Sequence, residues 1–296
     1  MRFKLTPMSM QRPSSTPRPL FGPAIVLLLG SAVAVALALS GTATSGTSQR
    51  PVYQPPQRYY LALGDSIAYG FQPNKAAAPP SVVAGYVGLF AAHLRKLSPK
   101  IEVVNYGCPG ESTVTFTRGR CPWLVEGRKL HDKFRGSQLK AAVAFLRAHR
   151  GQVSPITLTL WGNDVAPLSA KGKRAPRVIA SFASRFDAIL KQLRSAAPNS
   201  EIIVTGAWDL EADRLEQTKP LYRSLGAAIG RVAAASRAHV ANMFAVFNGP
   251  GNVGAQKARL CRLTFFCSKA DPHPTDAGYR AMADAFITAS RYPRKP

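Results

Sequence analysis

Short apolar runs alternate with amphipathic stretches along the chain from Tyr59 onward. Five runs have the length and composition of β-strands, at residues 59–63, 101–105, 156–160, 202–205 and 239–244. Helical periodicity lies between them, at residues 86–97, 139–149, 178–193 and 221–235, and a last helix is expected from Thr275. Strands that alternate with helices form parallel sheets covered on both faces. The pattern therefore predicts an α/β fold, a three-layer α/β/α sandwich around a five-stranded, mostly parallel sheet.

The N-terminus has the features of an export segment. Four basic residues and no acid precede residues 24–39, which are apolar apart from one Gly and one Ser, and small residues follow. This order predicts a signal peptide over residues 1–43, and an uncleaved signal anchor is the alternative. Residues 44–58 are rich in Gly, Ser, Thr, Gln and Pro and predict an extended linker. One domain is then expected over residues 59–296, in a secreted or extracytoplasmic protein, either free or tethered by its N-terminal segment.

The chain is strongly basic, with 39 Lys and Arg against 15 Asp and Glu and a formal net charge of +24. A nucleic-acid binder, a protein that works near anionic surfaces and a basic exported enzyme would each fit this charge. The sequence has no recognised helix-turn-helix, RNA-binding or zinc-finger signature. Export would also separate the protein from nucleic acid. The charge therefore favours anionic cell-surface polymers or lipids as partners, and no nucleic acid.

Four cysteines, Cys108, Cys121, Cys261 and Cys267, would meet oxidising conditions after export. Four cysteines allow three disulfide pairings. Pairing of Cys108 with Cys121 and of Cys261 with Cys267 closes the shortest loops and is the pairing that we expect. A metal site is less well supported, because neither pair has C-x-x-C spacing and no histidine lies at ligand spacing from them.

Polar segments follow three of the predicted strands, and another precedes the last helix. They are Leu63 to Ser66, Asn105 to Ser112, Gly162 to Asp164, and Asp271 to Pro274. Each segment alone fits a turn or a helix cap. Open parallel sheets, however, bind ligands beyond the carboxyl ends of their strands. We therefore expect a functional site where these segments meet.

Taken in order, the four segments resemble the motif blocks of the GDSL family of SGNH hydrolases, over the region from Tyr59 to Ser290. The resemblance implies a flavodoxin-like sandwich with Ser66 as the nucleophile and His273 as the catalytic histidine. It also implies an oxyanion hole formed by the main chain of Ser66, by Gly110 and by Asn163. Such an enzyme cleaves carboxylic esters through an acyl-enzyme on the serine and needs neither a metal nor an organic cofactor.

One position departs from the family pattern. The family acid usually lies three residues before the histidine, where this chain has Ala270, and the nearest acid is Asp271. Either Asp271 or a main-chain carbonyl could orient Nδ1 of His273. We favour Asp271 as the third catalytic residue, because an ionised partner stabilises the imidazolium that forms in the transition state.

The substrate is less constrained than the reaction. Three segments are candidate rims of the pocket, at residues 121–136, 208–218 and 249–262, and the first is basic. We expect a monomer that acts on small-molecule or lipid esters, either as a lipase or phospholipase or as a sugar-acyl esterase. The alternative from another class is a non-catalytic module that binds anionic envelope polymers on the same fold.

Overall fold

The computed structural model describes residues 56–75, 85–290 and 292, so the predicted export segment and nearly all of the predicted linker lie outside the described residues. Within these ranges the chain forms a five-stranded sheet in which every pair of neighbours is parallel. The strand order is β2-β1-β3-β4-β5. This is the flavodoxin-like order. The strands are β1 (Tyr59–Gly64), β2 (Glu102–Asn105), β3 (Val153–Thr159), β4 (Ile202–Thr205) and β5 (His239–Ala241).

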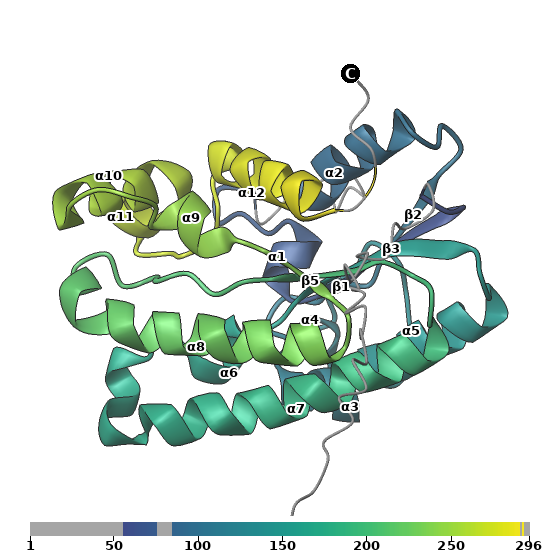
Figure 1. The fold of residues 1–296 in the computed structure, drawn as a ribbon, viewed down its shortest axis with the longest axis horizontal. Coiled ribbons are helices and arrows are strands. Elements are labelled where there is room, and N and C mark those ends of the chain that lie inside the picture. The colour runs from purple at the N-terminus through teal and green to yellow at the C-terminus, as the bar shows by residue number, and fades with distance from the viewer. Residues whose placement is uncertain (1–55, 76–84, 291, 293–296) are drawn as a thin grey trace, which may run out of the picture. The chain divides into compact units, whose positions relative to one another are not determined.

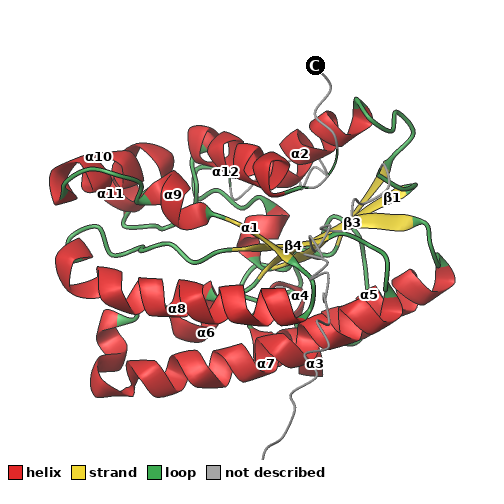
Figure 2. Ribbon diagram, viewed as in Figure 1, coloured by secondary structure: helices red, strands yellow, loops and turns green. Residues whose placement is uncertain are grey.

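Helices cover both faces of the sheet (Figure 1; Figure 2). On one face lie α2 (Gly85–Arg95) and α12 (Asp276–Ala289), and on the other lie α5 (Gln138–Ala148), α7 (Ala175–Ala196) and α8 (Leu215–Ala235). This arrangement confirms the predicted three-layer sandwich. None of the helices in the described ranges has the length and hydropathy needed to span a bilayer.

Further helices, most of them short, occupy the connections between these elements. They are α1 (Ser66–Tyr69), α3 (Thr113–Arg118), α4 (Pro122–Val125), α6 (Gly162–Val165), the 3-10 helix η1 (Ser169–Arg174), α9 (Met243–Phe247), α10 (Val253–Leu263) and α11 (Phe266–Lys269). Helical periodicity did not predict them, because most are too short to present a repeated apolar face. They matter for function, since the polar segments found in the sequence lie in or beside them.

The predicted boundary of the fifth strand is wrong. The strand was expected to reach residue 244, but β5 ends at Ala241 and α9 begins at Met243. The Asn242 side chain accepts a hydrogen bond from the main-chain N–H of Ala245 and so caps this helix. A cap of this kind satisfies an N–H that has no partner inside the helix. The apolar residues at 243 and 244 therefore continue as a helix.

The core is built from the central strands and the apolar faces of the long helices. All residues of β1, β3 and β4 are buried. The periodic residues of α7 face inward as predicted, with Phe182, Phe186, Ile189 and Leu193 buried. On the opposite face the Phe286 ring of α12 stacks on Tyr86 of α2, with 4.4 Å between the ring centroids. Burial of large apolar side chains is the main stabilising contribution here.

We predict that Phe286→Ala lowers the free energy of unfolding by about 3–5 kcal/mol, because the ring is fully buried between α2 and α12 and leaves a cavity. Urea denaturation measures this loss. The control is Asp284→Ala on the exposed face of the same helix, which should change stability by less than about 0.5 kcal/mol. Equal losses in the two variants would contradict this packing.

Candidate active site

The turn after β1 places Ser66 at the carboxyl edge of the sheet. Gly64 has a φ of 127°, and a Cβ atom there would lie 2.1 Å from the main-chain oxygen of Thr159. Asp65 follows as the N-cap of α1, where its Oδ1 accepts hydrogen bonds from the Ile67 N–H at 3.0 Å and from the Thr159 hydroxyl at 2.9 Å. Burial raises the pKa of Asp65 to about 6, and these hydrogen bonds oppose the rise only in part. Asp65 thus holds the turn, and Ser66 begins the helix.

Ser66, His273 and Asp271 form a continuous chain of hydrogen bonds. Nε2 of His273 lies 2.8 Å from Oγ of Ser66, and Nδ1 lies 2.7 Å from Oδ1 of Asp271. The same carboxylate oxygen accepts the main-chain N–H of His273 at 2.8 Å. With Nδ1–H donating to Asp271, Nε2 is free to accept the serine proton. The structure therefore brings the three expected residues together, with Asp271 at the position that a carbonyl would otherwise take.

Asp271 is held in its ionised form. Partial burial acts to raise the pKa of this carboxyl, but the hydrogen bonds from the ring and main chain of His273, together with nearby positive charge, outweigh burial. The pKa of Asp271 therefore lies below its usual value. An ionised carboxylate next to Nδ1 accepts the ring N–H and so favours the tautomer in which Nε2 carries no proton.

Main-chain hydrogen bonds fix the segment that carries His273. The carbonyl of His273 accepts the Phe265 N–H at 3.0 Å, and the Thr275 N–H donates to the Leu263 carbonyl at 2.9 Å. A disulfide joins Cys261 in α10 to Cys267 in α11, beside the residues that make these bonds. His273 therefore lies in a turn that is held by main-chain hydrogen bonds and leads directly into α12.

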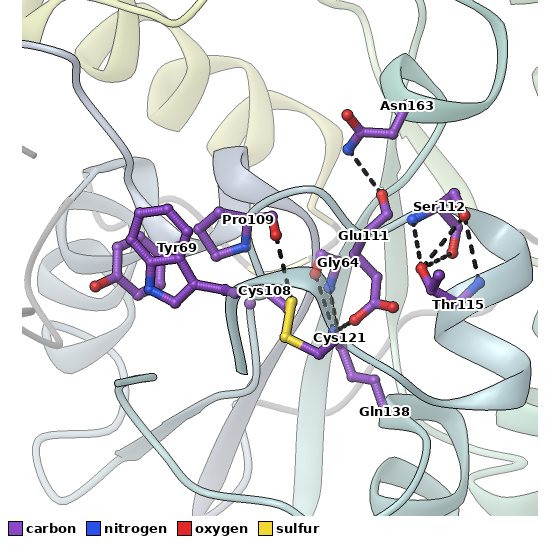
Figure 3. Close-up of a disulfide and its surroundings, with 12 residues drawn as sticks. Gly64, Tyr69, Cys108, Pro109, Glu111, Ser112, Thr115, Cys121, Gln138 and Asn163 are labelled. Carbon is purple, nitrogen blue, oxygen red and sulfur yellow. Dashed lines mark hydrogen bonds between the residues drawn. A yellow bond between two sulfur atoms is a disulfide. The ribbon is translucent and has the colours of Figure 1, made fainter. Parts of the chain in front are cut away.

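The turns after β2 and β3 carry Gly110 and Asn163, the residues expected to be oxyanion donors. Gly110 has a φ of 84°, and a Cβ atom at this position would lie 3.0 Å from the Pro122 ring. The disulfide between Cys108 and Cys121 closes this loop (Figure 3). Nδ2 of Asn163 donates to the main-chain oxygen of Glu111 at 2.8 Å, so the two turns lie side by side (Figure 3). An amide carries two N–H groups, and the described residues supply a partner for one of those of Asn163.

Asp164 ties Asn163 to the rest of the fold. Its carboxylate accepts the main-chain N–H of Thr113 at 2.8 Å and a bond from Arg185 at 3.0 Å. Arg185 also donates to the Thr113 hydroxyl at 2.7 Å. This network links α6, α3 and α7 and fixes the turn from which Asn163 projects.

A family comparison agrees with this arrangement. The model of the GDSL-like lipase/acylhydrolase family matches residues 62–281. The chain belongs to this family. It is accordingly an ester hydrolase, as the sequence segments led us to expect. None of the curated proteins matches the hydrolase.

Solved structures share its fold. A GDSL-like lipase candidate from Parabacteroides merdae has 16% sequence identity and a TM-score of 0.54, over 80% of this chain and 97% of that chain. The acetylxylan esterase Axe2 from Geobacillus stearothermophilus has 15% identity and a TM-score of 0.51, over 80% and 95%. The lipase Lip_vut3 from a goat rumen metagenome has 16% identity and a TM-score of 0.51, over 79% and 97%. At these identities the likeness establishes the fold of the hydrolase and leaves its substrate open.

A cleft of about 510 Å³ opens beside Ser66 in the hydrolase. Ser66, Asn163 and His273 line this cleft, whereas Gly110 and Asp271 do not. The wall is largely apolar, and Trp161 and Trp208 pack edge to face there with 4.7 Å between their centroids. Further apolar lining comes from the side chains of Leu210, Phe266 and Pro167. The volume suits a small organic ligand.

Two of the three predicted rims of the pocket are wrong. Residues 208–218 contribute to the lining, but residues 121–136 and 249–262 do not. Cys121 and Leu130 are buried in a small apolar cluster with Tyr69 and Cys108, which holds the first segment beside the Gly110 loop. The second segment forms α10, which packs on α9 and α12. Sequence analysis missed Trp161 and Phe266, because nothing in their local pattern distinguishes cleft residues from core residues.

Sequence analysis also missed a buried link below the site. Nε2 of Gln138 donates to the carbonyl of Gly64 and to Oε2 of Glu111, both at 3.0 Å, and Oε1 of Gln138 accepts the Gly64 N–H at 2.6 Å (Figure 3). Glu111 is 1% exposed, and its Oε1 has no hydrogen-bond partner in the described part of the chain. Burial raises the pKa of Glu111 to about 7. Gln138 thereby connects the turn that carries Ser66 with the turn that carries Gly110.

A possible metal site at this link is ruled out by the disulfide. In the described ranges, Cys108, Glu111 and Cys121 are the residues whose potential ligand atoms cluster closely. Both sulfur atoms are bonded to each other. They are therefore not available as thiolate ligands.

We predict that Glu111→Gln becomes more stable relative to wild type as the pH rises. Because the folded pKa of about 7 lies above the usual 4.5, the unfolded state loses this proton first, and wild-type stability falls between pH 4.5 and 7. Above that range, the ionised and buried Glu111 carboxylate lowers the free energy of unfolding of wild type by about 3 kcal/mol. Urea denaturation at pH 4 and pH 8 should show the variant gaining on wild type by about this amount.

The matched control is Glu216→Gln, which removes the same charge from an exposed position on α8. It should differ from wild type by less than about 0.5 kcal/mol at both pH values. A Glu111→Gln variant that shows the same difference from wild type at pH 4 and pH 8 would contradict the raised pKa.

Proposed function

We propose that the protein is an exported serine hydrolase that cleaves carboxylic esters through an acyl-enzyme on Ser66. The observation that carries the proposal is the hydrogen-bonded chain of Ser66, His273 and Asp271, with distances of 2.8 and 2.7 Å. A serine hydroxyl is a weak nucleophile until a neighbouring base takes its proton. Nε2 of His273 lies 2.8 Å from this hydroxyl and both residues line the cleft, which supports His273 as the base.

The reaction then follows in two acyl transfers. Oγ of Ser66 attacks the ester carbonyl while its proton passes to Nε2 of His273, and Asp271 stabilises the resulting imidazolium. The imidazolium gives this proton to the departing alcohol, and an ester bond to Ser66 remains. Water loses a proton to His273 and attacks the acyl-enzyme. The imidazolium then returns this proton to Oγ of Ser66 as the bond to the acyl group breaks and the carboxylic acid leaves.

Negative charge develops on the carbonyl oxygen in both steps. We assign its stabilisation to the N–H groups of Ser66 and Gly110 and to the side-chain amide of Asn163. The first N–H groups of a helix have no partner within the helix, and Ser66 begins α1. The bonds of Asn163 to the Glu111 carbonyl and of Asp164 to Thr113 support this assignment, because they fix the donor before substrate arrives.

The apolar wall of the cleft supports an ester with an apolar group of moderate size as the substrate. Trp161, Trp208 and Phe266 would bury such a group beside Ser66. A lipid ester and an acylated sugar both contain this element, and rates across a panel of chain lengths and head groups would separate them.

Export of the enzyme is supported by two independent features. The N-terminal stretch at residues 24–39 has the composition of a signal sequence. Both cysteine pairs form disulfides in the fold, and such bonds persist in oxidising compartments.

We predict that Ser66→Ala abolishes turnover of a short-chain nitrophenyl ester while the far-ultraviolet circular dichroism spectrum stays unchanged. Loss of the nucleophile should also abolish stoichiometric labelling by a serine-directed phosphonate. Ser268→Ala, an exposed serine in α11, serves as the control and should keep both properties. Labelling or turnover retained by Ser66→Ala would refute the mechanism and leave a non-catalytic binding module as the better explanation.

We predict that Asp271→Asn lowers kcat by up to about 10⁴-fold, because an amide in place of the carboxylate favours the wrong tautomer of His273. Steady-state kinetics on the same ester measures the effect. Asp276→Asn is the control, since this exposed carboxylate at the start of α12 contacts Gln72 and Lys75 and does not contact His273. A kcat for Asp271→Asn within tenfold of wild type would show that another group orients the histidine.

A further inference from the structure

A surface beside the Gly110 loop combines exposed aliphatic side chains with positive charge. Within the described residues, the large apolar side chains that are exposed are Val114, Leu124 and Val125, and Val125 is 65% exposed. All three fall within α3 and α4. Six exposed basic residues lie in the same stretch, and they are Arg118, Arg120, Arg128, Lys129, Lys133 and Arg135. We call residues 114–135 the α3–α4 surface.

The two acids of this stretch do not cancel its charge. Glu126 is paired with Arg128 at 3.1 Å. Asp132 accepts the main-chain N–H of Asn105 at 2.8 Å and so serves to hold the stretch against β2. The outward-facing charge of the α3–α4 surface is therefore strongly positive.

The tip of this surface, which we define as residues 121–129, is held in a fixed shape. The guanidinium of Arg128 lies 4.3 Å from the centroid of the Trp123 ring, and Nε1 of Trp123 donates to the carbonyl of Lys129 at 3.1 Å. The disulfide from Cys121 anchors the tip to Cys108. No residue of α4 is buried. Leu124 and Val125 are therefore presented to solvent from a braced turn.

The tip also lies next to the proposed active site. The ring of Phe71 is 5.8 Å from that of Trp123 and 4.7 Å from that of His273. Two ring contacts thus connect α4 with the histidine. On the other side, Pro122 of α4 packs where a side chain on Gly110 would lie.

We propose that the α3–α4 surface docks the protein on a lipid bilayer that contains anionic headgroups, with Leu124 and Val125 entering the headgroup region. Basic residues near a membrane surface are attracted to anionic lipids. Exposed apolar side chains gain by leaving water at the acyl boundary, and tryptophan is enriched at such interfaces. A soluble anionic polymer would use the charges alone and would leave Leu124 and Val125 in water. Docking in this way brings His273, which is two ring contacts from Trp123, close to the bilayer, whichever ester the enzyme cleaves.

The first experiment tests the contribution of the positive charges by cosedimentation of the full chain with vesicles. It uses a Ser66→Ala background so that no lipid is hydrolysed. Phosphatidylcholine vesicles are compared with vesicles that also contain phosphatidylglycerol. We expect binding to rise with phosphatidylglycerol and to fall with salt. A triple variant with the changes Arg120→Gln, Lys133→Gln and Arg135→Gln removes three of these positive charges. It should lower the partition coefficient roughly a hundredfold, at about fivefold for each charge.

A matched triple variant removes three exposed charges near the starts of β2 and β3, with the changes Lys100→Gln, Arg147→Gln and Arg150→Gln. It should lower the partition coefficient by less than about fivefold, because these residues would face away from the bilayer. Equal losses in the two triple variants would overturn the proposal, since attraction would then depend on total charge alone.

The apolar arm uses Leu124→Ser combined with Val125→Ser. This variant should lower vesicle binding roughly tenfold and leave binding to dextran sulfate unchanged. In the active Ser66 enzyme it should also leave turnover of a soluble ester unchanged, so failure of docking is distinct from failure of the mechanism. Unchanged vesicle binding would overturn the proposal and assign the surface to soluble polyanions.

A local probe separates docking by α4 from attachment through the N-terminal apolar stretch. A bimane label on Val125→Cys should shift its emission to shorter wavelength when anionic vesicles are added. The same label on Arg147→Cys should not shift. No shift at position 125, or equal shifts at both positions, would overturn the proposal.

Discussion

The close approach of β1 and β3 at their carboxyl ends determines where the chemistry can take place. Gly64 lies so near the Thr159 carbonyl that no side chain fits between the strands. The Thr159 hydroxyl then bonds to Asp65, and the Gln138 amide bonds to both main-chain polar groups of Gly64. These contacts fix the direction in which the chain leaves the sheet. They therefore also fix the position of Ser66, which lies two residues after Gly64.

The turns that carry Gly110 and Asn163 are connected to this turn through polar contacts. Gln138 connects Gly64 to Glu111, the Glu111 carbonyl accepts the amide of Asn163, and Asp164 joins Thr113. Each bond alone contributes modestly to stability, but several bonds that connect neighbouring turns hold their groups in one arrangement. Such fixed donors stabilise developing charge without having to reorganise during the reaction. The site is therefore rigid on the side of the proposed oxyanion donors.

The sequence predicted the sheet and the hydrogen-bonded residues better than it predicted the surroundings. Strand and helix positions follow from periodicity, because it reports which face of an element is buried. Ser66 and His273 could be chosen because four short polar segments, taken in order, resemble the motif blocks of the GDSL family, and Asp271 is the acid nearest to His273 in the sequence. The contact between Gln138 and Glu111 could not be predicted, since it depends on how α5 packs against the sheet. The same holds for Trp161 and Phe266, whose place in the cleft is set by tertiary packing.

The hydrogen bond between Ser66 and His273 joins residues that are 207 positions apart. During synthesis the N-terminal parts of a chain emerge first. The serine turn can therefore form long before its base exists, and a serine without its base is a weak nucleophile. In the folded protein the histidine segment leads into α12, which packs on α2. The nascent chain would therefore lack the proposed pair of nucleophile and base until its last segments have been made and packed.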